Sequence, residues 1–242
     1  MNNVPAARRR RAVAHHSPPD AALPDLSAIV PALNAARSLP ATLASLAGVT
    51  DVVVVDGGSG DGTPDIAASH GAHATAAPRG RGAQLAAGVA AAQHAWLLLL
   101  HADTRLGSGW QAAAGAHIAR FPDRAGYFRF ALDCSDPHAR RLERLVAGRC
   151  RVFALPYGDQ GLLIHHDLLR AVGGIRPLPL MEDVDLVRRL GRGRLNALDA
   201  AAETSAERWL RDGWLRRSAR NLVCLGLWFA GVPPRQIARL YR

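Results

Sequence analysis

The sequence predicts an α/β fold: a Rossmann-like, mostly parallel sheet with helices on both faces, plus C-terminal helices. Strand-like and helix-like segments alternate from residue 26 onward, and the segments 51–56 and 96–100 are almost entirely apolar. Such alternation is typical of parallel strands joined by helices, and unbroken apolar runs indicate strands buried on both faces. The 242 residues are enough for one large domain.

The individual elements follow from periodicity and from turn residues. We expect strands at 26–31, 51–56, 72–77, 96–100 and 126–133, and helices at 39–47, 63–70, 81–93 and 107–120. Thr63 is the expected N-cap of the second helix, because Pro64 suits the first helical position and Gly71 ends the pattern. The segment 126–133 alternates apolar and polar residues, which indicates an edge or antiparallel strand.

Three regions are expected along the chain. Residues 1–25 are basic, proline-rich and without periodicity, which predicts a disordered basic tail; no apolar stretch follows Arg8–Arg11, so a secretory signal is not expected. Residues 26–215 are the expected main domain, and 216–242 an amphipathic helical segment. The longest apolar run, 222–232, is about half the length of a membrane-spanning helix.

Composition narrows the chemistry. The formal net charge is +10, and all 30 basic residues are arginine, which excludes a lysine-containing phosphate loop and a Schiff-base lysine. A basic chain is compatible with anionic substrates, anionic membranes or nucleic acid. The three cysteines, Cys134, Cys150 and Cys224, are far apart, which predicts reduced thiols in a cytoplasmic protein rather than disulfides or a zinc site.

The ends of the expected strands carry polar side chains, and ligands of open α/β sheets bind at the carboxyl ends of strands. The glycines of residues 57–62 fail as a dinucleotide fingerprint, because Thr63 stands where a third glycine is needed. A carboxylate such as Asp56 accepts hydrogen bonds from a ribose hydroxyl or a base N–H. The loop 78–82 offers arginines to an anion, although a solvated basic turn is equally consistent.

His101 and Asp103 follow the buried run 96–100, where a short acidic motif is a fixed platform for Mg²⁺ or Mn²⁺. The alternative is that both residues cap the next helix or pair with an arginine.

Six motifs occur in a characteristic order: IVPALN, VVVVDGGSGDGT, PRGRGAQLAAG, LLLLHADT, GDQG and LMEDVDLVRRL. This set resembles family 2 glycosyltransferases of the GT-A fold over residues 26–215, closest to the small bacterial branch described as arsenosugar-type or selenodomain-associated. The resemblance implies inverting transfer of a sugar from a nucleotide-diphosphate sugar to a hydroxyl or carboxyl acceptor. The acceptor would be a small metabolite or lipid-like, and a divalent metal, Mg or Mn, would assist.

The resemblance also implies roles for residues. Asp183 would be the catalytic base with Glu182 beside it, and Asp103 a metal ligand, with His101 where the first acid of an Asp-x-Asp motif usually stands. Nucleotide contacts would come from Pro31, Asn34, Asp56, Arg79 and Arg81. Contacts with the acceptor or diphosphate would come from Asp159, Gln160, Arg208 and Trp209, with Ser205 replacing the glutamine of a Gln-x-x-Arg-Trp motif.

The spacing of residues 182–189 adds two expectations. Glu182 and Asp183 point about 100° apart on a helix, so that one can face the cleft while the other braces it. Asp185 and Arg189, four residues apart, are expected to form a surface ion pair.

Three other classes of protein are alternatives to a glycosyltransferase. A nucleotidyltransferase would need a glycine-rich loop after the first strand, where this chain has PALNAARS. A nucleic-acid-binding protein would cluster arginines with stacking aromatics, but aromatic residues make up only 5% and the arginines are scattered, so no nucleic-acid partner is expected. A catalytically degenerate nucleotide-sugar binding module would keep the fold without turnover.

Residues 208–242 mix arginines with aromatic residues and leucines, which suits peripheral association with a lipid-like acceptor or with a membrane, at the inner face of the cell membrane. The alternative is that these helices cover the sheet or form a dimer contact.

Overall fold

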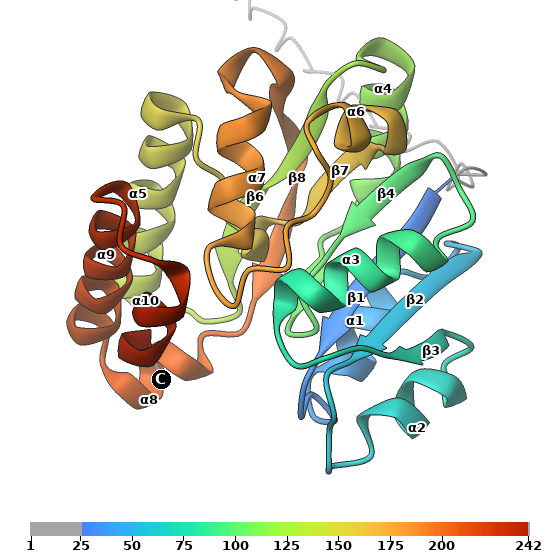
Figure 1. Ribbon diagram of the computed structural model, residues 1–242, viewed down its shortest axis with the longest axis horizontal. Coiled ribbons are helices and arrows are strands. Elements are labelled where there is room, and N and C mark those ends of the chain that lie inside the picture. The colour runs from blue at the N-terminus through green and yellow to red at the C-terminus, as the bar shows by residue number, and fades with distance from the viewer. Residues whose placement is uncertain (1–25, 242) are drawn as a thin grey trace, which may run out of the picture.

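The chain is built around one eight-stranded sheet with helices against both faces (Figure 1). The structure is a computed structural model, and it describes residues 26–241. The tail expected at residues 1–25 lies outside the described residues. The strands are β1 (Leu26–Ala32), β2 (Asp51–Asp56), β3 (His73–Ala76), β4 (Trp96–Leu99), β5 (Thr104–Leu106), β6 (Ala125–Leu132), β7 (Leu162–His165) and β8 (Leu195–Thr204).

The helices occupy the intervals between the strands and the C-terminal end. They are α1 (Leu39–Ser45), α2 (Thr63–Ser69), α3 (Arg81–Ala91), α4 (Trp110–Arg120), α5 (Pro137–Phe153), α6 (His166–Ala171), α7 (Glu182–Leu190), α8 (Glu207–Asp212), α9 (Trp214–Phe229) and α10 (Pro234–Tyr241). Two short 3₁₀ turns, η1 (Gly158–Gln160) and η2 (Arg192–Arg194), complete the set.

The sheet has the strand order β3-β2-β1-β4-β7-β6-β8-β5. The first four strands are parallel, with Ala28 paired to both Val52 and Leu98. β7 runs antiparallel to β4 and to β6, whereas β6 and β8 are parallel to each other, and β5 pairs antiparallel with β8. The expected parallel arrangement is therefore confirmed over β1–β4, and the second half of the sheet is mixed.

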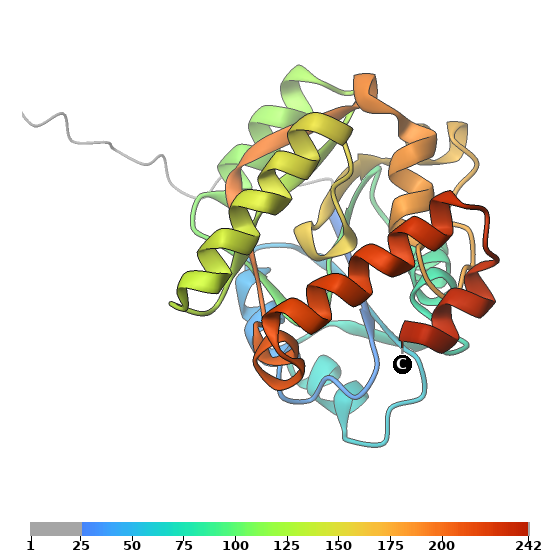
Figure 2. The same ribbon diagram turned by 90° about the vertical axis from the view of Figure 1, so that its left-hand side faces the viewer.

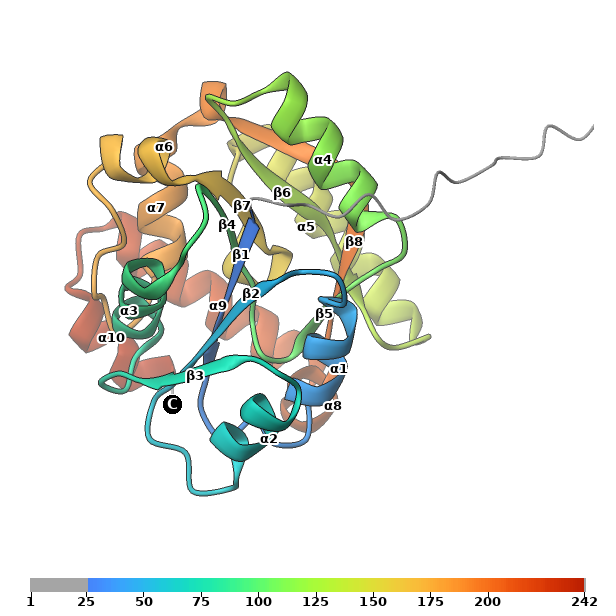
Figure 3. The same ribbon diagram turned by 90° about the vertical axis from the view of Figure 1, so that its right-hand side faces the viewer.

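The two faces of the sheet bury separate clusters of side chains because successive residues of a strand point to opposite sides. Ala28 and Val30 of β1 pack with Leu39 of α1 on one face. Ile29 packs with Leu85 of α3 on the other face. Helices α1, α2 and α4 thus cover one face, and α3, α6 and α7 cover the other, as Figure 3 shows for α3, α6 and α7 against α1 and α4.

Gly88 lets α3 lie directly on the sheet. A Cβ at this position would lie 2.3 Å from Cγ2 of Ile29 and 3.0 Å from Cγ2 of Val55, closer than packed carbon atoms approach. Since Arg81 is the first residue of α3, this close packing also fixes the position of Arg81 over the carboxyl edge of the sheet.

The C-terminal helices pack against the start of α7. Cys224 of α9 and Ile237 of α10 are completely buried and contact Leu180, Met181 and Val184. The boundary expected after residue 215 falls inside α9. None of the helices within residues 26–241 combines the length and the apolar character that a membrane crossing needs.

Several local expectations are corrected. The strand at 125–132 is not an edge strand; it lies between β7 and β8 and is antiparallel only to β7. Thr63 is the first residue of α2, and Gly62, with φ of 81°, takes the N-cap position. α5 was not expected from the sequence; it buries only Ala139, Val146 and Cys150, and its exposed side carries arginines together with Leu145, Val152 and Phe153.

Candidate active site

A cleft of about 770 Å³ opens at the carboxyl ends of β1 and β4, where neighbouring strands are connected in opposite directions. Such a switch point is the usual ligand site of open α/β sheets. The cleft is lined by many of the residues expected to bind a nucleotide, a metal or a diphosphate: Pro31, Asn34, Arg79, Arg81, His101, Asp103 and Arg208.

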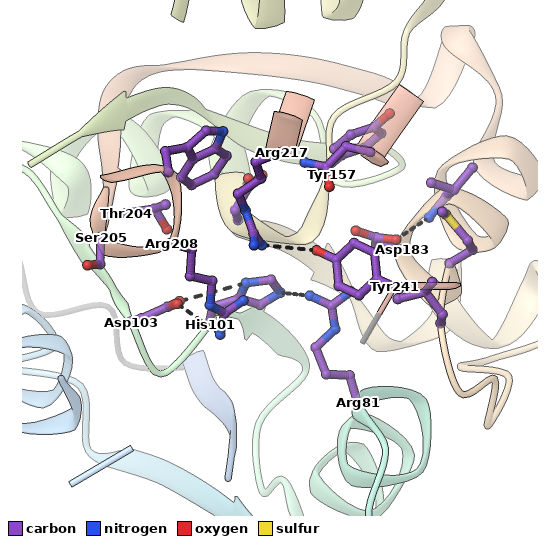
Figure 4. A pocket seen from close by; sticks show the side chains of 16 residues that line it. Arg81, His101, Asp103, Tyr157, Asp183, Thr204, Ser205, Arg208, Arg217 and Tyr241 are labelled. Carbon is purple, nitrogen blue, oxygen red and sulfur yellow. Dashed lines mark hydrogen bonds and ion pairs between the residues drawn. The ribbon is translucent and has the colours of Figure 1, made fainter. Parts of the chain in front are cut away.

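A smaller pocket of about 90 Å³ adjoins this cleft (Figure 4). Asp183, Asp159 and Trp209 line it. Arg81, His101, Asp103 and Arg208 are among the residues that line both cavities, so the cleft and the pocket meet there. The structure therefore brings the expected catalytic, metal and diphosphate residues together.

His101 is held by Arg81. Its Nε2 lies 3.1 Å from Nη1 of Arg81, and because a guanidinium only donates, Nε2 accepts this hydrogen bond and the ring proton sits on Nδ1. Burial, followed by the charges of Arg81 and Arg208, holds the pKa of His101 well below its usual range. The imidazole is therefore neutral near pH 7, with its one free lone pair already used.

Asp103 is the acid of the cleft that best fits a divalent cation. Its side chain is 25% exposed, and its Oδ2 lies 3.5 Å from Nη2 of Arg208. Within residues 26–241 no cluster of three or more histidines, cysteines or acids could hold a metal ion by itself. Mg²⁺ and Mn²⁺ often take one or two carboxylates together with ligand phosphates, so Asp103 fits such a shared site. His101 does not fit it while Arg81 occupies its lone pair.

Asp183 is fixed at the start of α7. Its Oδ2 accepts a hydrogen bond from the backbone N–H of Gly158 at 2.8 Å, and its Oδ1 accepts one from Val184 at 2.8 Å. A Cβ on Gly158 would lie 2.6 Å from Nε2 of His101 and 3.3 Å from Oδ2 of Asp183. Only glycine allows this backbone to approach both side chains at once.

The residue before α7 is strained. Met181 has φ of 65°, a left-handed conformation that costs about 1–3 kcal/mol for a residue other than glycine. It is held there by its burial between α9 and α10. This backbone conformation determines where the helix begins and therefore where Asp183 points.

Glu182 points away from both cavities. Its side chain is 2% exposed, and its Oε1 lies 2.7 Å from Nε of Arg81. Burial raises the pKa of Glu182, and the charge of Arg81 opposes that rise. Glu182 thus holds Arg81, which in turn holds His101, while Asp183 faces the pocket.

Asp159 and Gln160 have different positions. Asp159 lines the pocket, and burial raises its pKa to about 6, with Arg149 opposing and Asp183 adding to the rise. Its Oδ1 has no hydrogen-bond partner among the described residues. Gln160 is buried and lines neither cavity; its Nε2 donates to the carbonyl of Phe128, and its Oε1 accepts from Tyr157. Gln160 therefore stabilises the conformation of the loop around η1 by bonding the backbone on both sides.

Arg208 and Trp209 come from α8. Arg208 is half exposed and faces both cavities. Trp209 is mostly buried against Phe130, and the guanidinium of Arg217 lies 5.2 Å from its ring centroid. Ser205 lines both cavities as well, so the shortened motif keeps its place at the site.

Asp56 lies beneath the far end of the cleft and lines neither cavity. Its Oδ2 accepts hydrogen bonds from the backbone of Gly58 and Ser59, both at 2.9 Å. Burial alone would raise the pKa of Asp56, but hydrogen bonds from Ser59 and Gly58 leave it below its usual value. Asn34, with φ of 48°, accepts a hydrogen bond from Gly60 and joins this loop to the cleft wall.

Asp185 and Arg189 form an ion pair, but the expectation that the pair lies on the surface is wrong. Asp185 is only 6% exposed and binds Arg189 at 2.7 Å and Arg176 at 2.9 Å. Arg189 also donates to the carbonyl of Val172, so the pair is held between α7 and the segment that follows α6.

Four residues of the smaller pocket were missed by sequence reasoning: Tyr157, Arg217, Asn221 and Tyr241. Tyr241 lines both cavities, and its hydroxyl accepts a hydrogen bond from Nη2 of Arg217 at 3.3 Å. The only available signal was the mixture of arginine and aromatic residues after residue 208, which does not show which side chains turn inward.

Together, the parallel β1–β4 sheet with a cleft at its switch point and the mixed second half define a GT-A glycosyltransferase fold. Mannosyl-3-phosphoglycerate synthase from Rubrobacter xylanophilus superposes with a TM-score of 0.56 at 18% identity, covering 86% of this chain and 75% of that one. TarS from S. aureus superposes with a TM-score of 0.60 at 16% identity, covering 90% and 69%.

The sequence model of glycosyl transferase family 2 matches residues 27–147, and the chain belongs to this family. An uncharacterized glycosyltransferase of Mycobacterium tuberculosis is 38% identical over 85 residues, which are 35% of this chain and 39% of that protein. A relative of the same description from Mycobacterium bovis matches equally. The match thus spans well under half the length of these relatives.

Proposed function

We propose that this protein transfers a sugar, a hexose in our assignment, from a nucleotide-diphosphate sugar to an acceptor, with inversion at the anomeric carbon. The observation that carries the proposal is the junction of the two cavities. Arg81, Asp103 and Arg208 line the wide cleft, and the Asp183 carboxylate stands in the adjoining pocket. This layout suits a leaving diphosphate on one side of a reacting carbon and a base on the other.

The donor would occupy the wide cleft. We assign its base and ribose to the end near Pro31 and Asn34, where the loop held by Asp56 supplies the floor. The diphosphate would lie toward Arg79, Arg81 and Arg208, because guanidinium groups bind phosphate oxygens with paired hydrogen bonds. The same fold is known with nucleotide donors: a TarS structure at 19% identity and a TM-score of 0.59 is described in complex with UDP-GlcNAc.

Asp103 would hold a divalent cation together with the diphosphate. When bound, Mg²⁺ or Mn²⁺ stabilises the negative charge that develops on the leaving group. A glucosyl-3-phosphoglycerate synthase from Mycobacterium tuberculosis, which has the same fold at a TM-score of 0.51, is described with Mn²⁺ and UDP. In this assignment Arg208 and the cation together neutralise the negative charge of the diphosphate.

Asp183 would act as the base. It would remove the proton from the acceptor hydroxyl while that oxygen forms a bond to the anomeric carbon and the bond to the diphosphate oxygen breaks. Because attack and departure occur on opposite faces, the configuration inverts. The backbone hydrogen bonds from Gly158 and Val184 hold the carboxylate in position for this step.

The acceptor would enter the smaller pocket, between Asp159 and Trp209. We propose a hydroxyl or carboxyl compound that is small or lipid-like, handled on the cytoplasmic side of the membrane. The order of the motifs further supports membership in the arsenosugar-type branch of the family.

The donor assignment is tested by titrating UDP and GDP into the protein calorimetrically, with Mn²⁺ or with EDTA. We expect micromolar binding of one nucleotide with Mn²⁺ and a loss of about tenfold or more with EDTA. Asp103→Asn should remove the difference between the two conditions, whereas Asp167→Asn, a change at an exposed acid of α6, should keep it. Equal affinity with Mn²⁺ and with EDTA in the unaltered protein would refute the metal site.

A further inference from the structure

The exposed apolar side chains of this protein are concentrated on one side. Within residues 26–241, every large apolar side chain that is mostly solvent-exposed lies on α5, α8, α9 or α10: Leu145, Val152, Phe153, Leu210, Leu215, Leu222, Val223, Phe229 and Leu240. α5 and α9 lie in front of the molecule in the view of Figure 2. We call the outward sides of these two helices the α5–α9 face. Its concentration of apolar side chains is typical of an interaction surface.

The stripe along α9 is continuous. Leu215, Leu222 and Phe229 are 85%, 67% and 50% exposed and are spaced seven residues apart, so they share one side of the helix. Ala219 and Gly226 fall between them and are also exposed. The opposite side of α9 is occupied inside the molecule, where Cys224 is buried and Arg217 lines the smaller pocket. The outward stripe is therefore not needed for folding against the sheet.

The charge around this stripe has one sign. α9 and α10 contain no Asp or Glu, and their exposed arginines are Arg216, Arg235 and Arg239, whereas Arg217 and Arg220 turn inward and pair with Asp212. α5 adds five arginines against one acid, Glu143, which is paired with Arg140. A second copy of this chain would bring the same positive charge to the contact. An anionic partner is therefore favoured over self-association.

We propose that the α5–α9 face docks onto an anionic lipid bilayer, lying in the headgroup region without crossing it. Leu215, Leu222 and Phe229 would enter the boundary between headgroups and acyl chains, while the arginines contact lipid phosphates. The aromatic residues highlighted in the sequence have a different role: Trp209 is buried in the core, and Trp214, Trp228 and Tyr241 pack against core clusters. Phe153 and Phe229 are exposed aromatic residues of the face.

Docking would place the smaller pocket close to the bilayer. Arg217 and Asn221, which line the pocket, are on the inward side of the same helix whose outward side carries the stripe. A lipid-borne acceptor could then reach the pocket around α9 and α10. This consequence depends on the proposed transferase, whereas bilayer binding itself does not.

The test is flotation of the full-length protein with vesicles, without donor or metal. We expect it to float with phosphatidylcholine vesicles that contain about 30 mol% phosphatidylglycerol and to remain at the bottom with pure phosphatidylcholine. Leu222→Glu/Phe229→Glu should reduce flotation by about tenfold or more. Ala112→Glu/Ala116→Glu, at exposed positions of α4, adds the same charge elsewhere and should change flotation little.

Circular dichroism melts establish that both variants are folded, and nucleotide titration establishes that the donor site is intact. Absence of flotation by the unaltered protein overturns the proposal. Equal flotation of the two double variants overturns the assigned face. Sedimentation that shows a dimer dissociated by Leu222→Glu/Phe229→Glu, together with no flotation, would make the face an interface between two copies. None of these outcomes depends on sugar transfer.

Discussion

The two carboxylates of the smaller pocket differ in what surrounds them. Asp183 accepts a backbone hydrogen bond on each oxygen, whereas Asp159 has an oxygen without a partner among the described residues and a pKa raised by burial to about 6. Two acids that share a site but differ in environment usually take different roles. We propose Asp183 as the base because the backbone orients both of its oxygens, whereas burial disfavours the ionised form of Asp159.

Asp183→Asn should lower turnover by about 10²–10⁴, the usual contribution of a general base, and leave donor affinity nearly unchanged. Asparagine keeps the size of the side chain but cannot take up the proton. The measurement is turnover with saturating donor, alongside calorimetric titration of the nucleotide. Asp167→Asn on α6 is the matched control and should behave like the unaltered protein. Normal turnover of Asp183→Asn with an inactive Glu182→Gln would reverse the assignment.

Asp159→Asn should stabilise the protein at pH 8. The folded-state pKa of about 6 lies above the usual value of an aspartate, so the folded state prefers the protonated acid, and ionisation of Asp159 at high pH lowers stability. Removing this charge should raise the melting temperature by about 2–4 °C at pH 8, which corresponds to about 1 kcal/mol. The gain should shrink as the pH falls through 6 and vanish near pH 4. Thermal melts of both proteins between pH 4 and 8 measure this dependence. A gain in melting temperature that is independent of pH would contradict the role of Asp159 ionisation.

At the scale of secondary structure, α10 supports the helix that carries Asp183. Ile237 is completely buried against Met181 and Val184, whereas Leu240 on the same helix is 58% exposed. Contacts made by Ile237 therefore reach the strained residue at which α7 begins.

Ile237→Ala should lower the free energy of unfolding by about 2–4 kcal/mol, the usual effect of truncating a buried isoleucine. It should also raise the acceptor KM more than the donor Kd, because Ile237 contacts the start of α7 and does not itself line the donor cleft. Leu240→Ala provides the control and should change stability by less than about 0.5 kcal/mol. Urea denaturation and initial-rate kinetics measure both effects. Equal losses from the two substitutions would show that α10 is not docked as described.

The parallel half of the sheet could be predicted because each strand there is followed by a turn signal and a periodic helix. The rest could not, for local reasons. β5 has three residues, β7 has four, and β8 is a run of small and polar residues from Leu195 to Thr204. The sequence of α5 is dominated by arginines, and its buried residues Ala139, Val146 and Cys150 pack in part against α8, which lies far away along the chain.

The candidate site divides in the same way. The residues after β1, β3 and β4 were found because strand ends of a parallel sheet meet at one edge. The hydrogen bond that His101 accepts from Arg81 could not be predicted, and neither could the inward orientation of Tyr241. Each depends on a contact between distant segments of the chain. Gln160 was misplaced because its motif shows a polar residue in a loop and not the buried carbonyl of Phe128 that it binds.

At the scale of the whole molecule, the site is assembled from nearly the entire described chain. Residues from Pro31 to Tyr241 line the wide cleft, and no single helix or strand supplies more than a few of them. The pairing of β5 with β8 brings Thr104 against Thr204, one hundred positions apart, and carries Ser205 and Arg208 to the side of Asp103.

This long-range pairing has a kinetic consequence for how the protein acquires activity. The β1–β4 units join segments that are close along the chain, whereas the β5–β8 pair must close a much larger loop, and chains of this length commonly fold through intermediates. On dilution from urea, we expect helical ellipticity to recover well before Mn²⁺-dependent nucleotide binding does. Brief unfolding, too short for proline isomerisation, should leave this delay in place. With such a delay, ellipticity overestimates the yield of protein with an assembled site early in refolding. Recovery of both signals in a single common phase would contradict the delay.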